Sequence, residues 1–108
     1  MKMDIQIHSK LSPENVTVKL SDTLVKLKVR FGQRFWCSDV APTGDLTKEI
    51  VMDDFGFHSV SSLLVTDTTK QFDDFDTVTR LLRSAIGEEN SIVIYADTGR
   101  LFPEIDYD

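Results

Sequence analysis

The sequence contains a single cysteine, only two histidines and no long hydrophobic run. Because Cys37 has no second cysteine to pair with, an intramolecular disulfide and a cysteine-based zinc cage are both excluded. No apolar stretch approaches the roughly 20 residues of a membrane-spanning helix. The alternating residues 1–8 also lack the continuous apolar run of a signal peptide. These absences predict a soluble, cytoplasmic protein without a membrane partner.

Sequence motifs for catalysis or cofactor binding are also lacking. The five glycines are dispersed, so none forms a phosphate-binding loop. His8 and His58 are far apart, and Cys37 stands in no nucleophile motif. The acids at 53–54 and 73–76 do not have the spacing of a calcium-binding loop. We therefore expect no catalytic residues, no metal and no cofactor, and a small enzyme or metal-binding protein is the third choice of function.

One short segment is similar to a catalytic motif. Asp97-Thr98-Gly99 follows an apolar run, as the active-site triplet does in retroviral aspartic protease subunits. In that family the triplet lies near the start of the chain, whereas here only nine residues follow it. Arg100 also stands where a small residue is usual. Since Asp and Gly are ordinary turn residues, we interpret the triplet as a hairpin turn.

Alternating polar and apolar residues predict β-structure in the first half. Residues 15–20 and 24–31 have a period of two, and the Ser-Asp-Thr between them is typical of a hairpin turn. Segments 4–8 and 34–38 add two further strands, and 42–45 is expected to be a loop. This gives about four antiparallel strands with one apolar face that needs cover.

The second half supplies a helix for that cover. Apolar residues recur every three or four positions over residues 72–86, Asp73 or Asp74 can cap the start, and Gly87 fits the end. Residues 57–66 can be read as helix, strand or loop, and 91–96 fit a strand in the sheet interior. The prediction is one α+β domain, residues 1–108, with an antiparallel sheet of about four to six strands and one or two helices packed on one face.

Charge is distributed unevenly along the chain. Residues 1–50 contain eight Lys and Arg against six Asp and Glu, and residues 51–108 contain four against twelve. An acidic region with interleaved aromatic side chains is suited to a basic protein partner, such as a nuclease or a nucleic-acid-binding complex. The expected partner-binding residues are Asp53, Asp54, Phe55, Asp73, Asp74, Phe75, Asp76, Glu104, Asp106, Tyr107 and Asp108.

A basic face on the expected hairpin supports an alternative, a nucleic-acid-binding module. Its residues are Lys19, Lys26, Lys28, Arg30, Arg34 and Trp36. Basic side chains beside an aromatic are typical of proteins that bind single strands. The net charge of −6 disfavours this alternative, because it repels phosphate at long range.

In size, acidity and lack of catalytic motifs, the chain resembles two kinds of small inhibitor. One kind is the acidic inhibitors that phages raise against nucleic-acid-targeting defence systems, and the other is the immunity proteins that neutralise nuclease toxins. No motif of either kind is matched, so no functional residue follows from the resemblance. It implies a non-catalytic protein that inhibits or shields a basic partner, in part by nucleic-acid mimicry. The partner's identity and the oligomeric state stay open.

Overall fold

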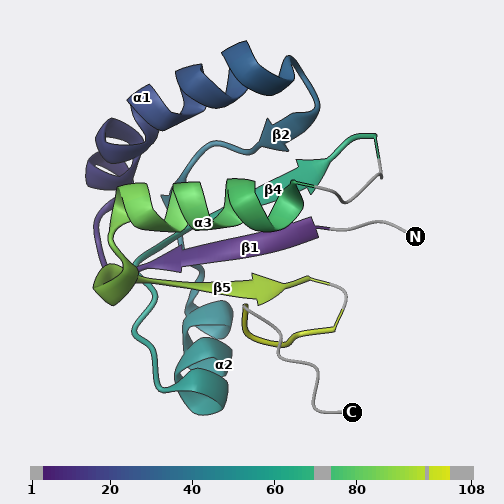
Figure 1. Ribbon diagram of the computed structural model, residues 1–108. Helices are drawn as coiled ribbons and strands as arrows, with labels where there is room; N and C mark the ends of the chain where they lie inside the picture. Colours follow the sequence, from purple (N-terminus) through teal and green to yellow (C-terminus); the bar gives the residue numbers. More distant parts are fainter. Residues whose placement is uncertain (1–3, 70–73, 97, 103–108) are drawn as a thin grey trace.

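The computed structural model describes residues 4–69, 74–96 and 98–102, and it forms an α+β fold (Figure 1). An antiparallel sheet of five strands carries three α-helices and one short 3₁₀ helix, which confirms the predicted class. The elements are β1 (Asp4–Ser9), α1 (Pro13–Phe31), β2 (Phe35–Cys37), β3 (Ala41–Pro42), α2 (Asp45–Phe55), β4 (Ser61–Asp67), α3 (Phe75–Ile86), η1 (Glu88–Asn90) and β5 (Ser91–Tyr95).

The sheet is built around β1 and β4, with the order β2-β4-β1-β5 and with β3 paired to β4. Ile7 of β1 lies opposite Leu63 of β4 and Val93 of β5. The prediction that residues 91–96 lie in the sheet interior is wrong, because β5 is the last strand of the sheet. It pairs with β1 on one side, and on its other side the described residues contribute an isolated bridge from Leu101 to Ile94. It is apolar on both sides because each of its faces is covered, Val93 in one core cluster and Ile94 in another.

The main core lies between one face of the sheet and the helices α1 and α3. Alternate strand residues point to this face, and helical residues spaced by three or four meet them. The buried residues of this core are Ile5, Ile7, Leu63, Val65 and Val93 from the sheet, Val16, Leu20 and Leu27 from α1, Phe75, Val78, Leu82 and Ile86 from α3, and Phe102.

The predicted hairpin over residues 15–31 is wrong, because these residues form α1. The Ser12 hydroxyl accepts a hydrogen bond from the Asn15 backbone N–H at 3.3 Å, and Pro13 stands at the first helical position, so the start is well specified. Gly32 ends the helix with a φ of 65°. Valine and threonine favour strands, yet burial of one helical face outweighs that preference.

The helix over residues 75–86 is confirmed as α3, with Gly87 at its C-terminal end. Asp74 occupies the N-cap position, but its side chain makes no capping hydrogen bond, so the predicted capping role is wrong for this residue. Asp73 lies outside the described residues. The undecided segment at residues 57–66 is largely strand, since β4 begins at Ser61.

The second face of the sheet carries α2, a helix that the sequence did not lead us to expect. It starts within the loop predicted at residues 42–45 and ends at Gly56, which has a left-handed φ of 63°. Val51 of α2 packs with Phe57 and Ile94 in a small second cluster, while Val93 faces the main core. Helices therefore lie on both faces of the sheet rather than on one (Figure 1).

Candidate partner-binding surfaces

The predicted acidic residues that the structure describes fall into two groups on opposite faces of the sheet. Asp53 and Asp54 are exposed in the last turn of α2, not in a loop. Asp74 and Asp76 are exposed at the start of α3, where Asp76 pairs with Arg80 Nε at 2.8 Å. Because α2 and α3 pack on different faces, the sheet separates the two groups. Asp73, Glu104, Asp106, Tyr107 and Asp108 lie outside the described residues.

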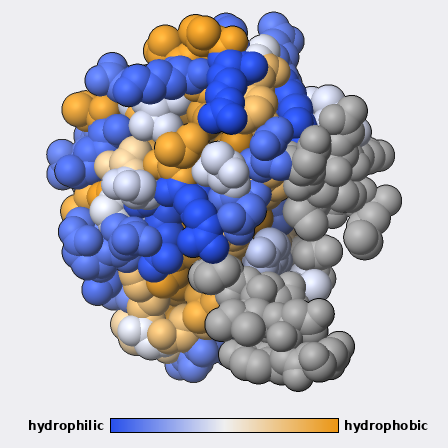
Figure 2. Space-filling view, in the orientation of Figure 1, coloured by the Kyte–Doolittle hydropathy of each residue, from blue (hydrophilic) through white to orange (hydrophobic). Residues whose placement is uncertain are grey.

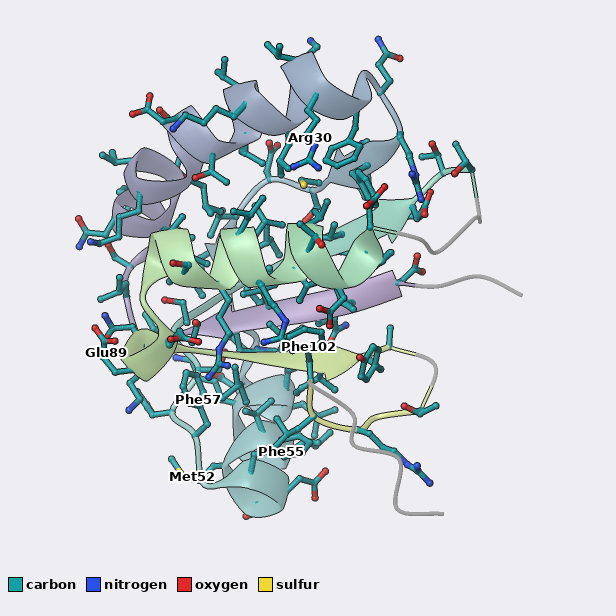
Figure 3. The ribbon with its side chains drawn as sticks, in the orientation of Figure 1. Arg30, Met52, Phe55, Phe57, Glu89 and Phe102 are labelled. Atoms are coloured by element: carbon teal, nitrogen blue, oxygen red, sulfur yellow. The ribbon has the colours of Figure 1, made fainter. Side chains whose placement is uncertain are left out.

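The two aromatic residues predicted beside these acids are not exposed anchors. Phe75 is 4% exposed and belongs to the main core. Its ring packs edge-on against the ring of Phe35, with 5.9 Å between the two ring centroids. The prediction that it lies on the surface is therefore wrong: the first residue of α3 points inward. Phe55 is half-buried against the second cluster, beside Phe57 on the α2 side of the molecule (Figure 3).

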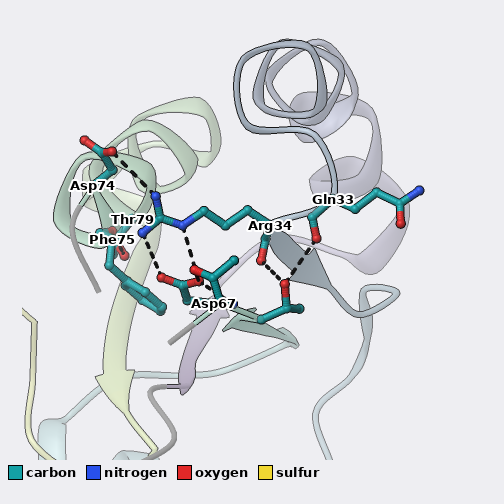
Figure 4. Close-up of polar contacts among 8 residues, drawn as sticks. Gln33, Arg34, Asp67, Asp74, Phe75 and Thr79 are labelled. Carbon is teal, nitrogen blue, oxygen red and sulfur yellow. Dashed lines mark hydrogen bonds and ion pairs between the residues drawn. The ribbon is translucent and has the colours of Figure 1, made fainter. Parts of the chain in front are cut away.

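Arg34 links three elements through buried charge (Figure 4). Its Nη2 lies 3.0 Å from Asp67 Oδ2, and its Nε donates to Asp67 Oδ1 at 3.3 Å. The Asp67 side chain is fully buried, so it is not part of the acidic surface. Arg34 Nη1 also lies 3.7 Å from Asp74 Oδ2. Arg34 and Asp74 therefore connect the start of β2, the end of β4 and the start of α3, which is a structural role.

The basic face expected on a hairpin is absent, because four of its six residues belong to the helix α1, Arg34 is held in the ion pair with Asp67, and Trp36 lies in β2. Lys19, Lys26 and Arg30 are exposed and, at spacings of seven and four, share one side of α1. Lys28 projects from another side, where it lines a groove of about 460 Å³ with Trp36, Phe35 and Leu27, among other residues. Nucleic-acid binding stays an untested prediction, but the sheet face that would have carried it is absent from the described structure.

Exposed apolar side chains gather on the outer faces of α1 and α2. Of the nine large hydrophobic residues exposed in the described part of the chain, six lie on these two helices. Figure 2 shows apolar groups at the top and the bottom of the visible surface, where Figure 1 places α1 and α2. The residues are Val18, Val25 and Val29 on α1, and Leu46, Ile50 and Met52 on α2. Leu46 and Ile50 are not among the predicted binding residues, although their spacing of four, with Gly56 after them, is a helical signal.

A polar network lies beneath the face that carries α2. His8 Nδ1 is 2.8 Å from Ser59 Oγ, which lies 2.7 Å from Thr43 Oγ1. His8 is buried, and this burial lowers the pKa of its imidazole. Its Nε2 has no hydrogen-bond partner among the residues that the structure describes. The network connects β1 to the loop before α2, so it is part of the scaffold of that region.

The described residues offer few groups suited to nucleophilic catalysis or metal binding. Burial raises the pKa of the Cys37 thiol to about 11, which keeps it protonated and a poor nucleophile. Residues 4–69, 74–96 and 98–102 contain no group of three or more His, Cys, Asp or Glu side chains placed to hold a metal ion. In the same ranges no helix is both long and apolar enough to cross a membrane.

Comparison with known proteins identifies the family. A search of curated proteins gave no significant match. Among solved structures, the fold is similar to a chain of the CdiA-CT/CdiI toxin and immunity complex from Burkholderia pseudomallei, with a TM-score of 0.79, 16% identity, and coverage of 95% of this chain and 99% of that one. The model of the CDI system immunity component family matches residues 1–98. Of the two kinds of inhibitor that the sequence resembles, the match confirms an immunity protein, and a nuclease as its toxin stays a prediction. This chain belongs to the family of CDI system immunity components.

Proposed function

We propose that this protein binds its cognate CdiA-CT toxin and neutralises it without catalysis. Family membership over residues 1–98 is the observation that carries the proposal. The similar fold in the CdiA-CT/CdiI complex supports it, since a toxin and an immunity protein are bound together there. Stoichiometric binding needs no reactive group on the immunity protein, and the high pKa of the Cys37 thiol is consistent with that.

The toxin is proposed to be basic, and to be a nuclease or another protein that acts on nucleic acid. The charge balance supports this: the chain has a net charge of −6, and twelve of its eighteen acids lie in residues 51–108. A basic cleft that holds nucleic acid attracts such a surface and is shielded by it. Complementary charge speeds association more than it adds affinity, so apolar contacts must supply much of the binding energy. The proposed compartment is the cytoplasm, where a lone Cys37 stays reduced.

Titration of the toxin tests both binding and the non-catalytic mode. Purified CdiA-CT is incubated with total RNA or plasmid DNA while this protein is added in steps. We expect degradation to stop at one equivalent, and calorimetry to report a one-to-one complex whose affinity falls with salt. Complete protection at a small fraction of an equivalent would indicate catalysis instead. If calorimetry at micromolar concentrations detects no complex, the proposal is wrong, and an intact substrate in every lane would argue against a nuclease.

A further inference from the structure

The helix α2 is attached to the rest of the protein by little buried surface. Val51 is its only buried residue, although the helix runs from Asp45 to Phe55. By contrast, α1 buries Val16, Leu20 and Leu27, and α3 buries five residues. The outer side of α2 is therefore free to contact another molecule.

That outer side has a regular pattern of apolar and acidic residues. Leu46 is 70% exposed and Ile50 is 50% exposed, and their spacing of four places them one turn apart on the same side. The acids Glu49, Asp53 and Asp54 are exposed around them. We call these five residues the α2 ridge: Leu46, Glu49, Ile50, Asp53 and Asp54. A single exposed apolar residue is common on protein surfaces. Two neighbouring apolar residues with acids around them form a small amphipathic surface.

Folding does not explain the position of two of these acids. Asp53 and Asp54 lie in the last turn of α2, which contains no basic residue. The C-terminal end of a helix carries partial negative charge, so carboxylates there are unfavourable. At the start of α3 the opposite holds: Asp76 faces a positive helix end and pairs with Arg80, and Asp74 is close to Arg34. The α3 acids therefore have a structural explanation, and the α2 acids do not.

Charge also distinguishes the α2 ridge from the other exposed apolar surface. Val18, Val25 and Val29 form a stripe on α1, but Lys19, Lys26 and Arg30 lie beside it. The groove at Trp36 is bordered by Lys28 in the same region. A basic partner is repelled from that side of the molecule and attracted to the α2 ridge.

We infer that the α2 ridge is the surface that docks onto the basic face of the toxin, an inference that rests on the proposed function. Leu46 and Ile50 fill an apolar depression, and Glu49, Asp53 and Asp54 pair with lysines or arginines around it. This matches the usual anatomy of an interface, with an apolar centre that slows dissociation and a charged rim that speeds association.

A matched pair of variants tests this inference. The double variant Leu46→Ser, Ile50→Ser removes the apolar centre of the α2 ridge, and the control Val25→Ser, Val29→Ser removes an equal number of exposed apolar residues from α1. Binding to purified CdiA-CT is measured by surface plasmon resonance after circular dichroism has verified that both variants fold. We expect the α2 variant to bind about 100-fold more weakly, mainly through faster dissociation. The control should stay within about threefold of wild type.

Hydrogen exchange on the unmodified protein provides a second measurement, independent of any variant. Adding CdiA-CT should slow exchange of amides in residues 45–55 more than in residues 13–31. If the toxin binds the wild type while the α2 variant keeps full affinity, or while protection appears on α1 instead, the inference is wrong and the proposed function stands. If the toxin does not bind the wild type, the proposed function itself has failed.

Discussion

The helices α1 and α2 both expose apolar side chains, but they do so for different reasons. On α1, Val25 and Val29 lie on the outside of a helix whose inner face is a main wall of the core. On α2, Leu46 and Ile50 belong to a helix that buries only Val51. The first helix contributes three buried residues to the main core, whereas the second contributes one to a smaller cluster. Exposure alone therefore does not identify a binding surface; the inner face and the surrounding charge must be considered with it.

The largest expected effect comes from breaking the buried charge pair that follows α1. Arg34→Met leaves the fully buried Asp67 carboxylate without its guanidinium partner. We expect the free energy of unfolding to fall by about 3–5 kcal/mol, because an unpaired buried charge is costly. Urea denaturation measures this loss, and adding Asp67→Leu should restore much of it. Since the pair lies away from α2, toxin affinity of the folded fraction should not change; a loss below about 1 kcal/mol would contradict the structural role.

Truncating one buried residue in α1 and one in α2 compares how much each helix contributes to stability. Leu20→Ala in α1 should cost about 2–5 kcal/mol, because Leu20 is completely buried in the main core. Val51→Ala in α2 should cost about 1–2 kcal/mol, since it removes two methyl groups from a smaller cluster. Hydrogen exchange should show global destabilisation for the first variant and faster local opening of residues 45–55 for the second. Equal global effects would mean that α2 is as integral to the core as α1.

Neutralising acids at the two helix ends separates folding from binding. Asp53→Asn with Asp54→Asn removes an unfavourable interaction at the end of α2, so stability should rise by about 0.3–1 kcal/mol for each residue. Association with the toxin should slow by about tenfold at low salt. The matched control, Asp74→Asn with Asp76→Asn, should lose stability and keep its association rate. Thermal unfolding measures the change in stability, and stopped-flow kinetics measures the association rate. If association slows only in the control variant, the toxin binds at the start of α3 rather than at α2.

The smallest effect concerns pH on the α2 side of the sheet. Burial lowers the pKa of His8 from its ordinary 6.5, so the unfolded chain takes up a proton that the folded protein does not. The free energy of unfolding should therefore decrease as the pH falls below 6.5, down to the lowered pKa of the folded state. His8→Asn, which keeps an amide near Ser59, should flatten this dependence between about pH 7 and 5.5. A slope identical to that of wild type would show that other groups cause it.

Parts of the fold could be predicted from the sequence where a single period dominated. The helical spacing over residues 75–86 with Gly87 after it, and the apolar run that became β5, each had one interpretation. In α1, Val16, Leu20 and Leu27 fit a helical face while the neighbouring valines fit an alternating strand. The capping signal at Ser12-Pro13 favours the helix, whereas the alternation alone predicts strands. The short α2 was missed because Gly44 and Asp45 also fit a turn.

The candidate surface could be predicted only in part. The excess of acids in the second half favours a basic partner, which stays a prediction, and sequence order does not show which face of a sheet a residue reaches. Asp67 belongs to the acidic second half, yet it is buried against Arg34, more than thirty positions earlier in the chain. Phe75 differs, because its spacing of three and four with Val78 and Leu82 already places it on the inner side of α3. The burial of Asp67 depends on its long-range contact with Arg34, which no local pattern encodes.

The thin attachment of α2 has a consequence for how such a protein can change over generations. Because ten of the eleven residues of α2 are not buried, most substitutions there leave the core and its register untouched. If the toxin docks on the α2 ridge as we infer, a change in its docking surface can be followed by changes at Leu46, Ile50 or Asp53 without compensating changes in the sheet. The fold and the recognition of a partner can then evolve almost independently within one small domain.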